Sequence, residues 1–204
     1  MTFSTIPQAI KSVRKGEMLI VVDDPKRENE GDFFIPAERA TPRAIAMMLK
    51  LGSGVLCVSM TRERQKRLRL PLMVKHRDNA EKTGVRFTVG FSASAGVTTG
   101  VSAYDRARTI RLTASPRAKA KDFTRPGHVL GLVAARRGLK ERRGHTEAAV
   151  ALAEIAGFEP VGVLCEIVRD DGRMARLPDL KKLSKKLGVH IIALKDLISY
   201  VENK

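Results

Sequence analysis

Short apolar runs alternate along the chain with segments in which apolar residues recur at helical spacing. The first pattern is typical of buried strands and the second of amphipathic helices. Strands are predicted within residues 17–24, 54–60, 85–93, 128–135, 161–168 and 189–194. Helices are predicted within residues 6–16, 38–54, 61–71, 102–115, 145–158, 177–188 and 195–201. This interleaving indicates a single α/β domain over residues 1–204, an α+β sandwich whose helices pack on a mixed sheet.

Several helix ends are marked by residues suited to caps and stops. Thr41 is expected to be an N-cap, with Pro42 at the first helical position. Ser102 is expected to open the helix that follows it. Thr146 is expected to cap a helix that ends before Gly157.

Composition limits the classes of protein that fit. The chain has 204 residues, of which 43% are hydrophobic, enough for one domain with a core. It shows neither an apolar run of the ~20 residues that span a bilayer nor a secretory signal. Cys57 and Cys165 lie in apolar runs, which favours reduced, buried thiols and a cytoplasmic protein.

The net charge of +16 raises the alternative of a nucleic-acid-binding protein. The basic residues are spread along the chain, and aromatic residues, which stack on bases, make up only 4%. Nucleic acid is therefore an unlikely partner, and the alternative predicts one contiguous basic face.

The first polar cluster is "RENEGD", directly after a predicted strand. In an extended segment Glu28, Glu30 and Asp32 point to one side, and Arg27 to the other. Three carboxylates on one side repel one another unless a cation lies among them, and Mg²⁺ prefers such oxygen ligands. The alternative is a charged hairpin loop with an internal Arg–Glu pair.

The second cluster is "KERRGHTEA". Arg142, Arg143 and Gly144 precede a predicted helix whose N-terminus includes Thr146. Backbone N–H groups, the helix dipole and guanidinium groups then converge as in a phosphate site. His145 stands beside them and is able to bind a metal ion as a neutral imidazole. The alternative is an ordinary capped helix with basic flanks.

Further polar residues interrupt strands and turns. Glu166 lies within the apolar run "VGVLCEIV", where an unpaired carboxylate costs several kcal/mol, and a raised pKa would suit it to proton transfer. His128 is expected in a tight turn, "TRPGH". The segment "GVTTGVSAYDR" offers a hydroxyl-rich turn for a polar ligand, with these residues: Thr98, Thr99, Gly100, Ser102 and Asp105.

Together these stretches resemble the 3,4-dihydroxy-2-butanone 4-phosphate synthase family of riboflavin biosynthesis. The similar segments occur in the family's order: "DDPKRENEGD", "GSGVLCVSM", "LPLMV", "FTV", "GVTTGVSAYDRARTI", "RPGHV", "GHTEA", "AGFEPVGVLCEIVRDDGRMARLPDL" and "LISY". They span nearly the whole chain, and their combination is very specific.

The resemblance implies an enzyme that converts D-ribulose 5-phosphate into formate and L-3,4-dihydroxy-2-butanone 4-phosphate. It implies a homodimer with active sites at the subunit interface, and Mg²⁺ or Mn²⁺ as the cofactor, two ions per site with substrate bound. Glu28 and His145 would bind the metal. His128, which in this family acts across the dimer interface, and Glu166 would carry proton transfers.

The remaining site residues also follow from the resemblance. The residues that would bind the substrate are Arg27, Glu28, Asp32, Arg142, Arg143, Gly144, His145, Thr146 and Glu166. The residues that would line the site are Glu30, Cys57 and Thr99.

Some positions depart from the family pattern. Val133 stands where the family has an arginine, and the stretch "ARRGLKERR" is more basic than usual, so its added arginines are expected to supply charge near the phosphate. The segment "KHRDNAEKTGVRFTV" is also unusual. These changes raise a third hypothesis, a weakly active paralogue that binds sugar phosphate. No fused cyclohydrolase domain is expected after "LISYVENK".

Overall fold

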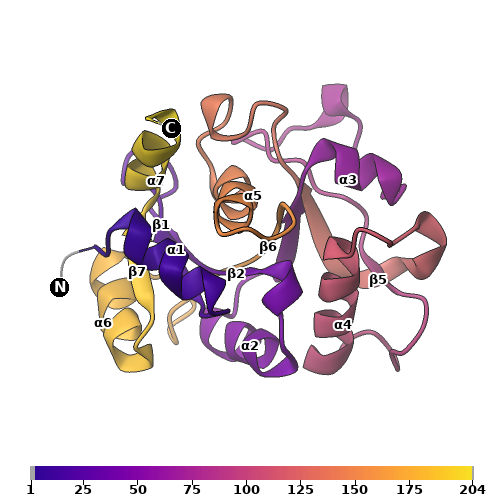
Figure 1. Cartoon of the computed structure of the whole chain (residues 1–204), viewed down its shortest axis with the longest axis horizontal. Coiled ribbons are helices and arrows are strands. Elements are labelled where there is room, and N and C mark those ends of the chain that lie inside the picture. Colours follow the sequence, from indigo (N-terminus) through magenta and orange to yellow (C-terminus); the bar gives the residue numbers. More distant parts are fainter. Residues whose placement is uncertain (1–2, 204) are drawn as a thin grey trace.

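A seven-stranded mixed sheet forms the centre of the molecule (Figure 1). The computed structural model describes residues 3–203. The strands are β1 (Leu19–Val22), β2 (Gly31–Pro36), β3 (Cys57–Met60), β4 (Phe91–Ala93), β5 (Phe123–Val133), β6 (Val161–Glu166) and β7 (His190–Ala193). Their order is β4-β5-β3-β6-β2-β1-β7. The pairs β1–β7 and β3–β5 are parallel and the others are antiparallel, so the predicted mixed sheet is confirmed.

Helices cover both faces of this sheet, as the α/β prediction requires. The helices are α1 (Ile6–Arg14), α2 (Pro42–Met47), α3 (Arg62–Arg67), α4 (Ala103–Ala114), α5 (His145–Ile155), α6 (Leu177–Leu187) and α7 (Leu194–Glu202). In Figure 1, α5 and α7 lie above the sheet and α2, α4 and α6 below it. Each face has its own apolar core, one joining α2, α4 and α6 and the other α1, α5 and α7.

Alternation along the strands divides the side chains between the two cores. Successive residues of a strand point to opposite faces of the sheet. On β2, Phe33 and Ile35 belong to the α2 side, whereas Phe34 belongs to the α5 side. On β6, Leu164 also faces the α5 side. Residues at even spacing from these therefore share the α5 face, and this places polar residues at the strand ends beneath the start of α5.

Several predicted boundaries are confirmed. Thr41 and Ser102 are N-caps as predicted, and Thr61 is the N-cap of α3. Each side-chain hydroxyl accepts a hydrogen bond from the third residue after it. The helix begun by α2 continues through a π-helical turn, Met48–Gly52, so it ends within the predicted range of 38–54.

Other predictions are wrong. Strand β2 was not predicted, although its aromatic and β-branched residues favour extended structure. Within 85–93 only β4 is a strand, because the residues before it pair only through isolated bridges at Phe87 and Thr88. The segment "TRPGH" is not a turn but part of the long strand β5. Helix α5 begins at His145 with Gly144 as its N-cap, so Thr146 is not the cap.

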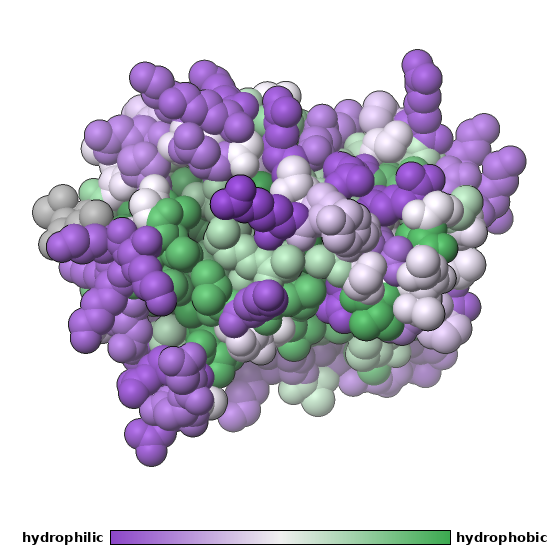
Figure 2. All heavy atoms as spheres, turned by 90° about the horizontal axis from the view of Figure 1, so that it is seen from below, coloured by the Kyte–Doolittle hydropathy of each residue, from purple (hydrophilic) through white to green (hydrophobic). Residues whose placement is uncertain are grey.

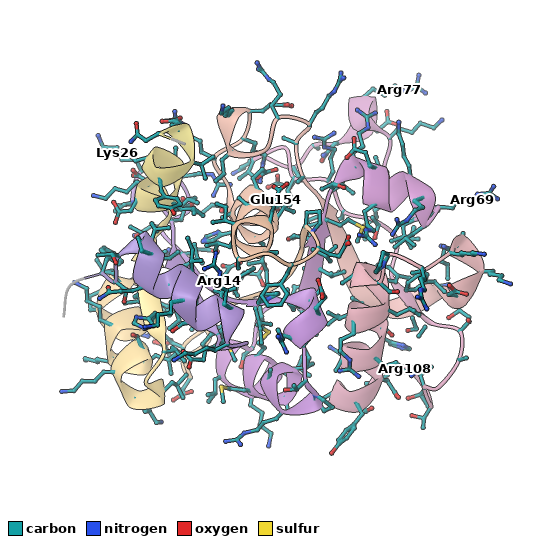
Figure 3. All side chains as sticks on the ribbon, in the orientation of Figure 1. Arg14, Lys26, Arg69, Arg77, Arg108 and Glu154 are labelled. Atoms are coloured by element: carbon teal, nitrogen blue, oxygen red, sulfur yellow. The ribbon has the colours of Figure 1, made fainter. Side chains whose placement is uncertain are left out.

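The surface shows where charge and apolar side chains gather. Lys26, Arg69 and Arg77 extend from separate edges of the molecule (Figure 3), so these three basic side chains do not share one face. Seen from below, apolar side chains gather in the middle of the face, within a hydrophilic outline (Figure 2). Among the described residues, no helix has the length and apolar character to cross a membrane.

Candidate active site

Polar side chains converge where β1 ends, β2 begins and β6 ends. Asp32 on β2 lies directly opposite Glu166 on β6, so their side chains share the α5 face of the sheet. Helix α5 packs on β2, β3 and β6, with His145 at its first position. The loop between β1 and β2 folds over the same place.

These elements enclose a cavity of about 210 Å³. The residues lining it are Arg27, Glu28, Glu30, Asp32, Glu81, Thr83, Val85, Phe87, Leu132, Arg142, His145, Thr146, Leu164 and Glu166. Eight residues of the predicted site are among them, gathered from three distant parts of the sequence: Arg27, Glu28, Glu30, Asp32, Arg142, His145, Thr146 and Glu166. The fold therefore brings the "RENEGD", "RRGHT" and "LCEI" segments to one point.

The carboxylates of this cavity are poorly solvated and close together. Burial, followed by repulsion from Glu166, raises the pKa of Asp32 well above its ordinary value. Burial and the charge of Glu28 also raise the pKa of Glu30. The Oδ1 atom of Asp32 is buried and accepts no hydrogen bond from the described residues. A bound cation would remove both the repulsion and this unsatisfied acceptor.

The surroundings of His145 suit a metal ligand. Its side chain is buried, and burial lowers its pKa, so the ring is neutral at neutral pH. Its Nε2 lies 3.2 Å from the carbonyl oxygen of Val21, a contact that places the proton on Nε2. The free lone pair of Nδ1 then faces two carboxylates, at 3.9 Å from Oε2 of Glu28 and 3.8 Å from Oδ1 of Asp32.

These separations fit a divalent cation. An ion bound by bonds of about 2.1 Å is able to reach both Nδ1 of His145 and Oε2 of Glu28. Ligand atoms of Asp23, Glu28 and His145 lie within 4.8 Å of one another. The donor set of imidazole and carboxylate suits Mg²⁺ or Mn²⁺.

Asp23 was missed by the sequence analysis, although it directly follows β1. Its side chain is buried, and Oδ2 accepts hydrogen bonds from Arg27 Nη1 (2.6 Å) and from the backbone N–H of Glu28 (3.2 Å). Oδ1 accepts the N–H of Asp24 at 2.7 Å. Because its oxygens already have donors, Asp23 orients the loop that carries Glu28.

The prediction that Arg27 faces away from the acidic side chains is wrong. Residues 25–28 form a turn, and Asn29 has a φ of 54°, so the segment is not extended. Nη1 of Arg27 therefore lies 2.5 Å from Oε2 of Glu28, the internal Arg–Glu pair that a hairpin loop allows. Arg27 and Glu28 both line the cavity.

The part of the cavity wall at the start of α5 suits an anion. Helix α5 starts without a side-chain cap, which leaves backbone N–H groups at its positive end. The guanidinium groups of Arg142 and Arg27 lie beside Gly144, where an added Cβ would come within 2.3 Å of Arg142 Nη1 and 3.1 Å of Arg27 Nη2. Two cations and a helix N-terminus at one point favour a phosphate.

Arg143 does not join this group. Its side chain is 67% exposed and donates to Oε1 of Glu202 at 3.2 Å, away from the cavity. The added basic residues also lie elsewhere, because Arg136 and Val133 line a separate cavity with Arg62 and Arg86. In the described structure these added basic side chains therefore do not line the cavity.

Glu166 lines the cavity, whereas Cys57, which was predicted to line it, is not among the lining residues. The backbone N–H of Val55 donates to Oε2 of Glu166 at 2.7 Å, which orients the carboxylate. Cys57 is buried on β3, and burial, then the charges of Glu166 and Asp32, raises the pKa of its thiol. The thiol stays protonated near neutral pH, so it is not a nucleophile there.

His128 and Thr99 lie apart from the cavity. Both side chains are exposed, and neither lines the space around Glu28 and His145. The backbone N–H of His128 donates to Oγ of Ser92 at 3.1 Å, and its ring is next to Gly100. The "RPGH" and "TTG" segments thus meet at a second location.

Polar groups of the hydroxyl-rich turn near Thr99 are hydrogen-bonded within the turn and the helix that follows it. The Asp105 carboxylate accepts hydrogen bonds from the Thr98 hydroxyl (2.8 Å), the Thr98 N–H (3.0 Å) and the Gly100 N–H (3.1 Å). These donors, led by the Thr98 hydroxyl, hold the pKa of Asp105 below its ordinary value. Asp105 therefore orders the loop rather than presenting its charge to a ligand.

We expect Asp105→Asn to lower the free energy of unfolding at pH 7. A lowered folded-state pKa contributes stability above the unfolded-state pKa, and this contribution is lost as pH falls through the folded-state pKa. The difference between the variant and the parent, measured by urea denaturation, should therefore narrow below about pH 4. A difference that stays constant from pH 7 to pH 3 would show that the charge contributes nothing.

The fold and this cavity define an α/β protein whose site suits a divalent cation and an anionic ligand. A family model for 3,4-dihydroxy-2-butanone 4-phosphate synthase matches residues 7–200. The chain belongs to the 3,4-dihydroxy-2-butanone 4-phosphate synthase family.

Individual relatives agree with this assignment. The chain is 52% identical over 198 residues to the monofunctional riboflavin biosynthesis protein RIBA 2, chloroplastic, of Arabidopsis thaliana, covering 97% of this chain and 42% of the relative. It is 45% identical to 3,4-dihydroxy-2-butanone 4-phosphate synthase of Tolumonas auensis, covering 98% and 91%. A crystal structure of 3,4-dihydroxy-2-butanone 4-phosphate synthase in complex with two magnesium ions has a TM-score of 0.93 and 40% identity, covering 99% and 98%. The chain thus spans less than half of the Arabidopsis relative.

Proposed function

We propose that this protein converts D-ribulose 5-phosphate into formate and L-3,4-dihydroxy-2-butanone 4-phosphate, a step of riboflavin biosynthesis, using Mg²⁺. The observation that carries the proposal is the cavity in which a neutral His145 faces Glu28 and Asp32. Next to them lie Arg142 and the uncapped start of α5, the helix that His145 begins. A sugar phosphate fits such a site, because its sugar oxygens are able to reach the cation while its phosphate binds at the helix start.

Glu28 and His145 would bind the metal ion, with Mn²⁺ as an alternative to Mg²⁺. When bound, the ion would stabilise negative charge that develops on the substrate oxygens. A second ion at the same site is supported by the similar structure that is in complex with two magnesium ions. The unsatisfied Oδ1 of Asp32 offers a further oxygen for an ion or for a substrate hydroxyl.

The phosphate would lie at the start of α5. Arg142 and the N–H groups of His145 and Thr146 would hold it, which fixes the sugar chain relative to the carboxylates. Arg27 and Asp32 would bind hydroxyl groups of the sugar. Arg143 is not included, because its side chain pairs with Glu202.

Glu166 would move protons during the reaction. The first step removes a proton from a carbon next to the ketone, and later steps lose water and formate, so one group has to act in turn as base and acid. The Glu166 carboxylate lines the cavity and keeps one oxygen bound to the Val55 N–H. Its other oxygen, Oε1, would then exchange protons with the substrate.

His128 would act from a second subunit. It is exposed and does not line the cavity of its own chain, which supports a homodimer with the active site at the interface. Large apolar side chains elsewhere in the chain are also exposed and would be available to such an interface. They are Val55, Met73, Val74, Val101 and Tyr104. The buried, free thiols of Cys57 and Cys165 support the cytoplasmic location proposed for the protein.

We expect Arg176→Ala to weaken Mn²⁺ binding about tenfold, as loss of a group that orients metal ligands typically does. Nη1 of Arg176 donates to the backbone carbonyl of Glu28 at 3.0 Å and also to that of Asn29, so it holds the loop that carries the metal ligand. Titration of Mn²⁺ by electron paramagnetic resonance measures the affinity. The control is Arg173→Ala, which changes an exposed arginine of the same segment. Equal affinities of the two variants would contradict the role of Arg176.

The reaction itself is tested by proton NMR of the purified protein with D-ribulose 5-phosphate and Mg²⁺. Formate should appear at a rate that depends on the metal, and its formation should stop when EDTA is added. Sugar phosphate binding without formate release would instead indicate the weakly active paralogue.

A further inference from the structure

Arg142 is held by partners on two sides of the cavity. Its Nε donates to the backbone carbonyl of Thr83 at 2.9 Å, and its Nη2 donates to the Thr83 hydroxyl at 2.8 Å. On the other side, Nη1 donates to Oε2 of Glu147 at 2.7 Å. Each guanidinium nitrogen thus has one protein acceptor, and one N–H group remains on Nη1 and one on Nη2. This pair is the arrangement that binds a phosphate through two parallel hydrogen bonds.

Glu147 is the buried member of this group. Its side chain is 1% exposed, and it lies in the first turn of α5, where the helix dipole favours a negative charge. Oε1 accepts the backbone N–H of Ala135 at 3.0 Å, and Oε2 accepts Arg142. Both oxygens therefore have donors, and the carboxylate is fixed between the end of β5 and the candidate active site.

Thr83 holds Arg142 from a loop. It belongs to the segment 81–85, which lines the cavity without forming a helix or strand. Glu147, in contrast, is anchored on a helix and is surrounded by buried residues. Glu147 is thus the partner of Arg142 that lies on a regular element of the fold, whereas Thr83 lies on a loop.

We propose that Glu147 is a positioning residue for the substrate phosphate, acting through Arg142. Glu147 holds the guanidinium so that its remaining N–H groups are available to an anion at the start of α5. Because two of the arginine's three nitrogens are engaged by the loop, the charge of Glu147 also keeps Arg142 from turning away with Thr83. This inference rests on the proposed function only for the identity of the ligand as a sugar phosphate.

The test is Glu147→Gln, which keeps the shape of the side chain and removes its charge. A glutamine is able to accept from only one of the two N–H groups, so either Arg142 or Ala135 loses its acceptor. Calorimetry with D-ribulose 5-phosphate in EDTA, where turnover is not expected, should show a dissociation constant raised about tenfold. In the presence of Mg²⁺, KM should rise by a similar factor, while kcat changes less than about threefold.

A double-mutant cycle with Arg142→Ala separates positioning from a purely structural role. If Glu147 acts through Arg142, Glu147→Gln should not weaken binding further once Arg142 is alanine. Independent, additive losses would overturn the proposal. Glu154→Gln, an exposed glutamate on the same helix and labelled in Figure 3, is the matched control and should bind like the parent protein.

Two further outcomes keep this inference distinct from the proposed function. Sugar phosphate binding that depends on Glu147, without formate release, would support the inference and overturn the function. Unchanged binding by Glu147→Gln, with normal formate release, would support the proposed function and overturn the inference about Glu147. If Glu147→Gln does not fold, Glu147→Asp, which keeps the charge but withdraws it from Arg142, should show the same rise in the dissociation constant, and parent-like binding would overturn the inference.

Discussion

Glu28→Gln is expected to lower the rate of formate release from D-ribulose 5-phosphate by roughly a thousandfold or more. An ion that stabilises developing charge supplies several kcal/mol, and each ~1.4 kcal/mol is tenfold in rate. Oε2 of Glu28 lies 3.9 Å from Nδ1 of His145, so an amide at position 28 removes the charge on one side of the candidate metal site. Initial rates measured by proton NMR at saturating Mg²⁺ give the effect.

The control for this prediction is Glu17→Gln, which also removes one carboxylate, at an exposed position before β1 and outside the cavity. It should retain the parent rate. His145→Ala should reproduce the loss seen with Glu28→Gln, since the two side chains would share one ion. Retention of more than about a tenth of the parent rate by Glu28→Gln would show that Glu28 is not a ligand.

The second large effect is expected when two inactive variants are mixed. Glu28→Gln and His128→Asn should each be nearly inactive alone. If His128 serves the site of the other subunit, a mixed dimer has one site with both substitutions and one site with neither. Random exchange of subunits after brief unfolding and refolding of an equal mixture should then restore about a quarter of the parent activity.

The control mixture is Glu28→Gln with Glu166→Gln. Both residues line the same cavity of one chain, so every site in a mixed dimer carries one substitution and no activity should return. Failure of the first mixture to regain activity, with mixed dimers shown by mass spectrometry, would place His128 in the site of its own chain or outside it. Recovery in the control mixture would contradict the assignment of Glu28 and Glu166 to one subunit.

Hydrophobic patterning predicts the architecture because a sheet covered on both faces requires apolar strands and amphipathic helices, and both leave a periodic pattern in the sequence. The strands carrying Cys57 and Cys165 and the amphipathic helix α6 were all visible as apolar runs or helical periodicity. Strand β2 was missed, because its apolar run at residues 33–36 is short and directly follows a charged segment. Alternation also gave the wrong orientation for Arg27, because residues 25–28 form a turn and not an extended strand. The turn brings Arg27 next to the carboxylate of Glu28.

The candidate site was predictable where residues neighbour one another in sequence, and less so where the fold brings them together. Segments around Glu28 and His145 were marked by unusual composition and by the family resemblance. The contact of Arg142 with Thr83 and the burial of Asp23 depend on loop paths that no short sequence pattern specifies. The position of Glu147 in the first turn of a predicted helix was visible in the sequence, and the helix dipole favours an acidic residue there. Its ion pair with Arg142 could not be predicted from that position.

The most direct test of the central claim is a single-turnover measurement. Protein freed of metal with a chelator is mixed with less than one equivalent of D-ribulose 5-phosphate per subunit, and formate is followed by proton NMR before and after addition of Mg²⁺. The account predicts no formate before the addition and one formate for each sugar phosphate consumed after it. Sugar phosphate that stays bound and intact in the presence of Mg²⁺ would contradict the account.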